Sequence, residues 1–328
     1  MISMAQIDPN GVCNAKCWFC PVAYAPNPDI GKKTMPIEMF RSLITQLHEG
    51  KGDFVSPRFN GIYTAHYNEV LMYPHLEEMF EILREFNLGT LILSNGTTLT
   101  PKRIDLLAKY PDVIRGVCLN IPASDPDTWA RLTGMNAKMF PHLIANIKYF
   151  HDTMPLYVAR KAFSIQINGV TENSLINRGG WVTQLSKAPA LDLDPETGDL
   201  RKAFNGFKQM FPDTQIYEMP SLIDRAGHLE NHEVITNRDG IDRYLSQGKT
   251  RVVGCGNGRE VGGRPNGWVH VNANGDLFLC CNDYNFDTIF GNLTEESLKT
   301  IWTGELRQQT IEQAYQSMCR TCASAIWE

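Results

Sequence analysis

Short apolar runs alternate with amphipathic stretches along the first two thirds of the chain. The apolar runs have the length of buried strands and lie at 3–8, 58–65, 89–95, 115–121, 162–168 and 214–219. The amphipathic stretches have the apolar spacing of helices and lie at 36–49, 75–87, 100–110, 139–150 and 199–211. This alternation predicts an α/β fold of parallel strands joined by helices, in which six strands make most of a TIM-like barrel.

The pattern changes after about residue 235. The segment 251–293 is rich in Gly and Asn, and it contains an expected hairpin whose turn is Asn274-Gly275. Two helices are expected to follow, at 294–303 and 304–317. We therefore predict a partial barrel over residues 1–235 and a small hairpin-plus-helix domain over residues 236–328.

Composition and charge exclude several classes of protein. A chain of 328 residues with 43% hydrophobic content can bury a large core. The net charge is −5 without any block of Lys and Arg, so a nucleic-acid partner is not expected. Neither a signal peptide nor a run of about 20 apolar residues is present, so we expect a cytoplasmic protein that does not enter a membrane.

The cysteines suggest two metal sites. The chain has nine, an odd number that does not suit a closed disulfide framework, at 13, 17, 20, 118, 255, 280, 281, 319 and 322. All except Cys118 fall into two groups at opposite ends of the chain.

The N-terminal group has the spacing C-x3-C-x2-C. A structural zinc site needs four protein ligands, whereas three thiols leave one corner of a cubane iron-sulfur cluster without a protein ligand. An open iron is a site for chemistry. The alternatives are three buried structural thiols or half of a zinc site.

This loop resembles that of the radical S-adenosylmethionine (SAM) superfamily. Cys13, Cys17 and Cys20 match the motif that holds a 4Fe-4S cluster after the first strand of a partial (β/α)6 barrel, and Phe19 matches its aromatic position. The resemblance implies that the cluster binds SAM and cleaves it reductively to a 5′-deoxyadenosyl radical, which takes a hydrogen atom from the substrate. It also implies an external one-electron donor of the flavodoxin or ferredoxin kind.

Three further segments resemble the SAM-binding segments of the family. Asn68-Glu69 stands where family members bind the methionine ammonium, although the flanking glycines and proline are missing. Ser94-Asn95 resembles the polar pair that meets the SAM ribose or carboxylate, and Asn120 is the corresponding polar residue of the fourth strand. Each residue also has an ordinary alternative. Glu69 could be a solvated glutamate, Asn95 could belong to a simple Asn-Gly turn, and Asn120 could be a core asparagine with its hydrogen bonds satisfied.

The C-terminal cysteines resemble the auxiliary-cluster domains named twitch and SPASM. Five cysteines are too few for the two clusters of a full SPASM domain, so the resemblance implies the shorter twitch form with one auxiliary iron-sulfur cluster, of the 4Fe-4S type. The implied ligands are Cys255, Cys280, Cys319 and Cys322, with Cys281 as the alternative to Cys280. A zinc ribbon on the same thiols is the alternative site.

Two segments suggest the substrate, CNAKCWFCP at 13–21 and GNLTEESLKTIWTGELR at 291–307. They resemble the twitch-domain dehydrogenases that oxidise an alcohol of an aminocyclitol, which implies a net two-electron oxidation of a small cyclitol- or sugar-like substrate. Arg225 stands where those enzymes carry an Arg-Gly-Gly segment near the substrate, and a similar string lies at 177–180. An insertion at 171–200 leaves a peptide-modifying enzyme, acting by cross-linking or epimerisation, as the rival. A binding module without catalysis, holding iron-sulfur or zinc, is the second alternative.

Overall fold

The computed structural model describes residues 1–25, 34–172, 184–187, 189–220, 222, 225–236, 244–257, 263–322 and 324–328. The string at 177–180 and part of the insertion at 171–200 lie outside the described residues. None of the described helices is long and apolar enough to cross a membrane.

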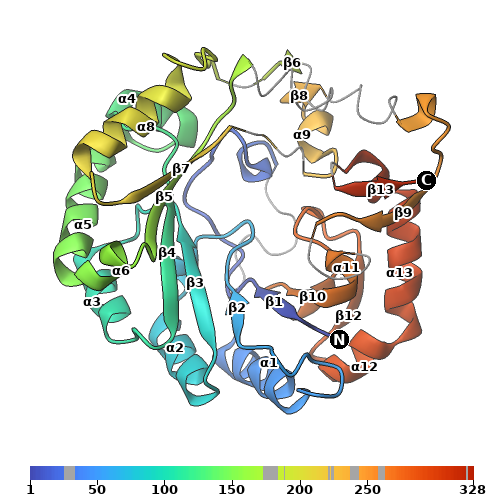
Figure 1. Ribbon diagram of the computed structural model, residues 1–328. Helices are drawn as coiled ribbons and strands as arrows, with labels where there is room; N and C mark the ends of the chain where they lie inside the picture. Colours follow the sequence, from blue (N-terminus) through green and yellow to red (C-terminus); the bar gives the residue numbers. More distant parts are fainter. Residues whose placement is uncertain are drawn as a thin grey trace.

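Six parallel strands form the barrel wall (Figure 1). They are hydrogen-bonded in chain order. Their bounds are β1 (Met4–Ile7), β2 (Gly61–Tyr63), β3 (Gly89–Ser94), β4 (Ile114–Asn120), β5 (Phe163–Asn168) and β7 (Gln215–Met219). All six lie within one residue of a predicted strand or inside it, and the predicted partial barrel is confirmed.

Amphipathic helices cover the outer face of this wall (Figure 1). They are α1 (Ile37–Glu49), α2 (Leu76–Glu85), α3 (Pro101–Ala108), α4 (Pro126–Thr133), α5 (Phe140–Thr153), α6 (Pro155–Ala159) and α8 (Asp199–Met210). In α1, Phe40, Leu43 and Leu47 are fully buried against the sheet, and each such side chain contributes about 1.5–3 kcal/mol. Asp125 caps α4, where its carboxylate accepts a hydrogen bond from the Thr128 N–H at 2.9 Å.

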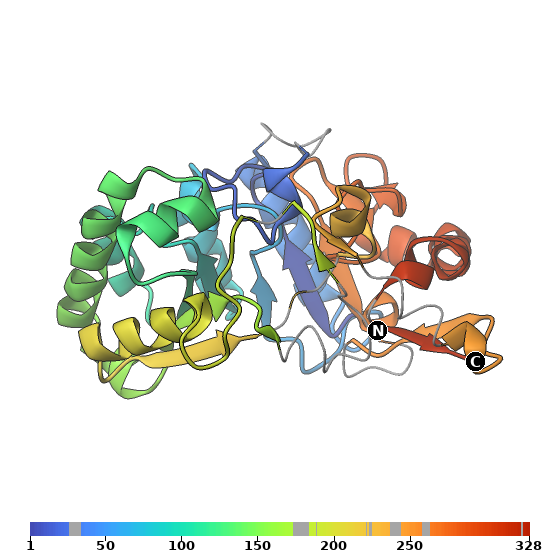
Figure 2. The ribbon, with the colours of Figure 1, turned by 90° about the horizontal axis from the view of Figure 1, so that it is seen from above.

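The C-terminal third extends the same sheet beyond β1. Strand β10 (Trp268–Val271) pairs with β1 in parallel, and β11 (Asp276–Phe278) and β12 (Ile289–Asn292) follow antiparallel, which makes nine strands. The turn between β10 and β11 contains Asn274 and Gly275, and Gly275 has a φ of 86° that suits glycine. Both views show these segments, in orange and red, on the side of β1 away from α5 (Figures 1 and 2).

Short elements complete the described part of the chain. The helices are α9 (His228–Asn231), α11 (Arg264–Gly267), α12 (Leu298–Thr303) and α13 (Glu305–Gln316), with single 3-10 turns at η1 (Pro21–Ala23), η2 (Val70–Met72), η3 (Ala137–Met139) and η4 (Met318–Thr321). Two small antiparallel pairs join β6 (Gln184–Leu185) to β8 (Ile235–Thr236), and β9 (Val252–Cys255) to β13 (Ala325–Trp327). The hairpin and both C-terminal helices were expected from the sequence, whereas β9, β12 and β13 were not.

Candidate radical SAM active site

The loop after β1 brings the three N-terminal cysteines to one cavity. Cys13, Cys17 and Cys20 line a cavity of about 460 Å³ inside the barrel. The loop is held against α4, because the N–H of Trp18 donates to the Leu132 carbonyl at 3.0 Å. A 2.8 Å hydrogen bond from the Cys20 N–H to the Cys17 carbonyl turns the chain between the last two thiols.

The three thiols are buried, and burial disfavours their charged form. Burial raises the pKa of Cys13 to about 11 and raises the pKa of Cys17 and of Cys20 above the ordinary thiol value. Without a cation the thiols are therefore protonated near neutral pH. Iron is a cation that thiolates bind and that displaces such protons, so three converging cysteines suit an iron-sulfur cluster.

Glu69 lies beside this loop and is only 1% exposed. Its two carboxylate oxygens accept hydrogen bonds from the backbone N–H groups of Leu71, at 3.2 Å, and Asn95, at 2.8 Å. Burial raises the pKa of Glu69, and the Asn95 N–H opposes that shift. This geometry excludes the alternative of a solvated glutamate and points a carboxylate into the cavity.

The other residues expected to bind SAM line the same cavity. They are Phe19, Asn68, Ser94, Asn95 and Asn120. The Asn95 side chain donates to Asn14 at 2.8 Å and approaches the Cys13 sulfur at 3.8 Å. The Asn120 side-chain oxygen is buried and has no partner among the described residues, so it is available to a ligand in the cavity.

Polar side chains continue the cavity through the barrel interior. Gln6, Gln166 and Asn168 line it, together with the thiol of Cys118 and the aromatic pair Tyr63 and Trp268. Sequence analysis missed the amides, although Gln166 and Asn168 alternate with apolar residues in a buried strand. A polar residue at every second position of such a strand is the signal that could have located them.

Two arginines and a fifth thiol, that of Cys281, also line this cavity. Arg225 follows β7 and lies with its guanidinium 5.8 Å from the centre of the Tyr67 ring. Arg264 contacts the sulfur of Cys281 and lies 4.5 Å from the centre of the Trp268 ring. Arg225 was expected near the substrate, whereas no sequence signal pointed to Arg264.

The other four C-terminal cysteines line a separate cavity. They are Cys255, Cys280, Cys319 and Cys322, and the rest of the lining is largely apolar. Backbone N–H groups donate to three of these sulfurs at 3.4 Å, those of Cys255, Cys280 and Cys322. The structure thus places Cys280 with the other expected ligands and Cys281 in the SAM cavity.

A buried ion pair joins the barrel to this cysteine segment. The Nδ1 atom of His66 is 2.8 Å from an Asp8 carboxylate oxygen, and both side chains are 2% exposed. The Nε2 atom of His66 is 2.8 Å from the Cys281 carbonyl oxygen, which can only accept. Burial lowers the pKa of His66, but Asp8 and Cys281 together outweigh burial, so the pKa lies above its ordinary value. The imidazole therefore connects the start of the N-terminal cysteine loop to the Cys280-Cys281 pair.

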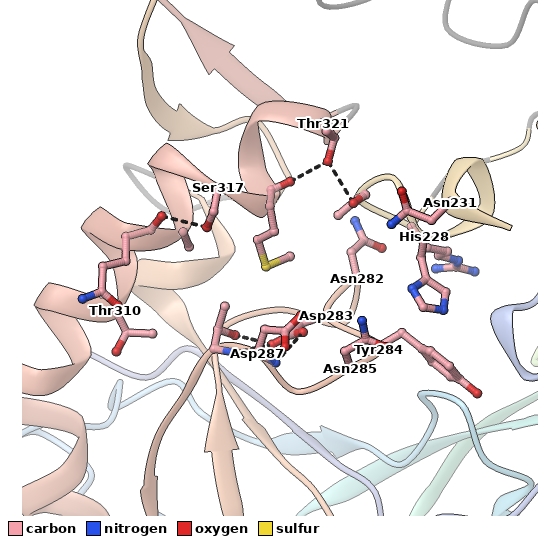
Figure 3. A pocket seen from close by; sticks show the side chains of 16 residues that line it. His228, Asn231, Asn282, Asp283, Tyr284, Asn285, Asp287, Thr310, Ser317 and Thr321 are labelled. Atoms are coloured by element: carbon pink, nitrogen blue, oxygen red, sulfur yellow. Dashed lines mark hydrogen bonds between the residues drawn. The ribbon is translucent and has the colours of Figure 1, made fainter. Parts of the chain in front are cut away.

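A second cavity of about 460 Å³ borders the four-cysteine group (Figure 3). His228, Tyr284 and Thr321 lie around it, on α9, the loop after β11 and η4 (Figure 3). Asn282 lines this cavity and donates its side-chain N–H to the Cys322 sulfur at 3.7 Å. Since Cys281 lines the first cavity, the segment 280–282 separates the two cavities.

The chain matches two protein families over these regions. Residues 7–177, just over half of the chain, match the radical SAM superfamily, and residues 263–323 match SPASM, an iron-sulfur cluster-binding domain. The chain belongs to the radical SAM superfamily, whose members bind SAM at a 4Fe-4S cluster. The second match adds an auxiliary iron-sulfur domain.

Particular relatives include a dehydrogenase and a protein bound to a precursor peptide. The S-adenosyl-L-methionine-dependent 2-deoxy-scyllo-inosamine dehydrogenase of Niallia circulans is 28% identical over 112 residues, which span 33% of this chain and 41% of that protein. The structure of BtrN with AdoMet and 2-DOIA aligns over 99% of this chain and 93% of its own, with a TM-score of 0.54 and 16% identity. Streptococcus suis SuiB bound to the precursor peptide SuiA aligns over 98% and 70%, with a TM-score of 0.59 and 14% identity. At these identities the structural likeness shows the fold alone.

Proposed function

We propose that the protein is a radical SAM dehydrogenase that oxidises a secondary alcohol of a small, hydroxyl-rich substrate such as a cyclitol or sugar. One observation carries the proposal. One cavity joins the regions of the two expected clusters. The N-terminal cysteines and Glu69 line one end of it, and Cys281 lines another part. The next residue along the chain toward the N-terminus, Cys280, belongs to the four-cysteine group. The sequence similarity to the inosamine dehydrogenase supports the reaction type.

The N-terminal cysteines and Glu69 act on SAM in this proposal. Cys13, Cys17 and Cys20 would hold a 4Fe-4S cluster, which with bound SAM would supply one-electron chemistry and the radical that removes a substrate hydrogen atom. Glu69 accepts the methionine ammonium in a charge-assisted hydrogen bond. Asn68, Ser94, Asn95 and Asn120 offer amide and hydroxyl groups to the remaining polar atoms of SAM.

The barrel interior holds the substrate. The amide groups of Gln6, Gln166 and Asn168 are neutral donors and acceptors, which suit hydroxyl groups better than charged groups. The surrounding wall excludes water and other hydrogen donors. Arg225 lines the same cavity, and its charge acts on the thiol of Cys20.

The C-terminal cysteines would hold an auxiliary cluster, which would supply an acceptor for the second electron. We assign Cys255, Cys280, Cys319 and Cys322 to one auxiliary 4Fe-4S cluster, because all four face one apolar cavity. Loss of one hydrogen atom, one electron and one proton leaves a carbonyl product two hydrogens poorer than the alcohol. We further propose a cytoplasmic enzyme that receives electrons from a flavodoxin- or ferredoxin-like donor.

Metal content and SAM cleavage test the proposal together. Anaerobically reconstituted protein should hold about eight irons and eight sulfides, for two cubane clusters, and should form 5′-deoxyadenosine with a strong reductant. Replacing Cys13, Cys17 and Cys20 together by Ala should leave about half of the iron and abolish 5′-deoxyadenosine. Cys118→Ala is the matched control for loss of a thiol and should keep all of the iron.

Either of two outcomes would contradict the proposal. Zinc rather than iron at the remaining four cysteines would remove the electron acceptor. If the enzyme modified a peptide and left hydroxylated small molecules unchanged, it would be a peptide-modifying enzyme and not a dehydrogenase of small molecules.

A further inference from the structure

Arg225 lines both of the large cavities described above. It borders the SAM cavity together with Cys20 and Cys281, and it borders the second cavity together with Thr321. Cys20 belongs to the N-terminal cysteine group, whereas Thr321 stands inside the C-terminal C-x2-C segment. The regions of the two expected clusters therefore share Arg225.

The backbone around Arg225 has an unusual conformation. Arg225, Ala226 and Gly227 all have positive φ angles, of 58°, 56° and 87°. Residues other than glycine rarely adopt this region, so surrounding contacts must hold the first two there. Thr321 supplies such a contact, because its hydroxyl donates to the Ala226 carbonyl oxygen at 2.9 Å (Figure 3). The segment between two expected ligands of the auxiliary cluster thus helps to position Arg225.

The guanidinium of Arg225 keeps its charge in these buried surroundings. Its Nε atom is buried and has no acceptor among the described residues. Burial lowers the pKa of Arg225, but neighbouring groups together outweigh burial and hold the pKa above its ordinary value. In order of their effect these groups are Tyr67, Cys281, Cys20 and Cys280. The charge therefore interacts with thiols of the N-terminal group and of the four-cysteine group.

A cation near two clusters affects the reduction potential of each. Reduction adds one negative charge to a cluster, so a fixed cation nearby stabilises the reduced state more than the oxidised state. Water screens this effect strongly, whereas a buried group is screened much less. The buried guanidinium of Arg225 meets that condition.

We propose that Arg225 is a common counter-charge for the N-terminal and auxiliary clusters and raises the reduction potentials of both. The proposal rests on the proposed function, because it needs both clusters, and it goes beyond the expected contact of Arg225 with the substrate. Arg225 thereby eases the two electron transfers that the proposed reaction needs, one into each cluster.

Redox titrations of the reconstituted enzyme, followed by EPR without substrate or SAM, test the proposal. Arg225→Met removes the charge and keeps a long side chain, and it should make the midpoint potentials of both clusters more negative. The EPR signal that changes on later addition of SAM identifies the N-terminal cluster. The auxiliary cluster is also titrated by itself, in protein with Cys13, Cys17 and Cys20 replaced by Ala, with and without Arg225→Met.

Further variants separate the charge from the shape of the side chain. Arg225→Lys keeps the charge and should restore most of both potentials. Arg225→Gln is polar and uncharged, should give the same fall as Arg225→Met, and replaces it if the Met variant does not hold iron. Arg41→Met is the matched control, because Arg41 is an exposed arginine paired with Glu85, and it should leave both potentials unchanged. The iron content of the parent in each variant shows that it folds and holds both clusters.

The proposal is overturned if either potential stays unchanged in an iron-loaded, uncharged variant of Arg225, or if Arg225→Lys shows the same fall as that variant. Weaker binding of substrate or of the SAM carboxylate, with both potentials unchanged, would make Arg225 a binding residue only. Each of these results, with two clusters and formation of 5′-deoxyadenosine in the parent, leaves the proposed function standing. Zinc at the four C-terminal cysteines, or no 5′-deoxyadenosine from the parent, would refute the proposed function itself.

Discussion

Replacing Glu69 by Gln should weaken SAM binding while leaving the fold and the cluster in place. The carboxylate is 1% exposed, and both oxygens are held by the backbone N–H groups of Leu71 and Asn95. The amide of Gln has nearly the same shape but one oxygen, so it loses the charge and turns an N–H toward one of these donors. A hydrogen bond to a charged group contributes about 1.5–3 kcal/mol, which is roughly a 10- to 150-fold rise in Kd.

Equilibrium dialysis of SAM against the anaerobically reconstituted variant measures this effect. Glu85→Gln is the matched control, since Glu85 is an exposed glutamate paired with Arg41. Both variants should keep the iron content of the parent. A Kd within threefold of the parent, in a Gln variant that is folded and iron-loaded, would show that Glu69 does not bind the ammonium.

The pH dependence of SAM affinity gives the same prediction a second readout. Burial raises the pKa of Glu69, so its carboxylate takes up a proton at a higher pH than an ordinary glutamate does. Only the ionised carboxylate accepts a charge-assisted bond from the ammonium. SAM affinity of the parent should therefore fall as the pH is lowered toward this raised pKa, and the Gln variant should lack that fall.

Two further predictions concern the residues next to the clusters. Turnover in deuterated water should place no solvent deuterium on a product carbon, and Cys118→Ala and Cys281→Ala should not change that result. Solvent deuterium that is lost in either variant would mean hydrogen return from a thiol, and thus epimerisation rather than oxidation. Asn282→Leu removes the N–H bond to the Cys322 sulfur and should lower the midpoint potential of the auxiliary cluster, because such bonds stabilise its reduced state. An unchanged potential in a redox titration followed by EPR would refute that role.

The barrel could be predicted because the sequence signals for its strands, helices and first cysteine motif lie within short segments. Each strand and helix has its own periodicity, and Cys13, Cys17 and Cys20 lie within eight consecutive residues. That Glu69 and Asn95 lie near each other could also be predicted from the strand order. Each follows a strand, and the carboxyl ends of neighbouring parallel strands meet at one edge of a sheet. The burial of Glu69 could not be predicted, because its segment lacks the flanking residues usual in the family.

The other end of the cavity could not be predicted from the sequence. Arg264 comes near the barrel only because β10 pairs with β1, and no local pattern indicates a pairing between such distant segments. The sequence also could not tell which of Cys280 and Cys281 faces which cavity. Both residues follow the end of β11, so the alternation of side chains along a strand does not apply to them. Their different surroundings depend on Arg264 and on the cavity that Cys319 and Cys322 help to line.

The pairing of β1 with β10 also limits how early the sheet can form during synthesis of the chain. A ribosome makes β1 at the start of synthesis, yet one edge of that strand stays uncovered until Trp268–Val271 has been made. Contacts so distant in sequence form slowly, and an open strand edge invites pairing with other chains. The loop that holds the first cluster is thus enclosed only after most of the chain has emerged.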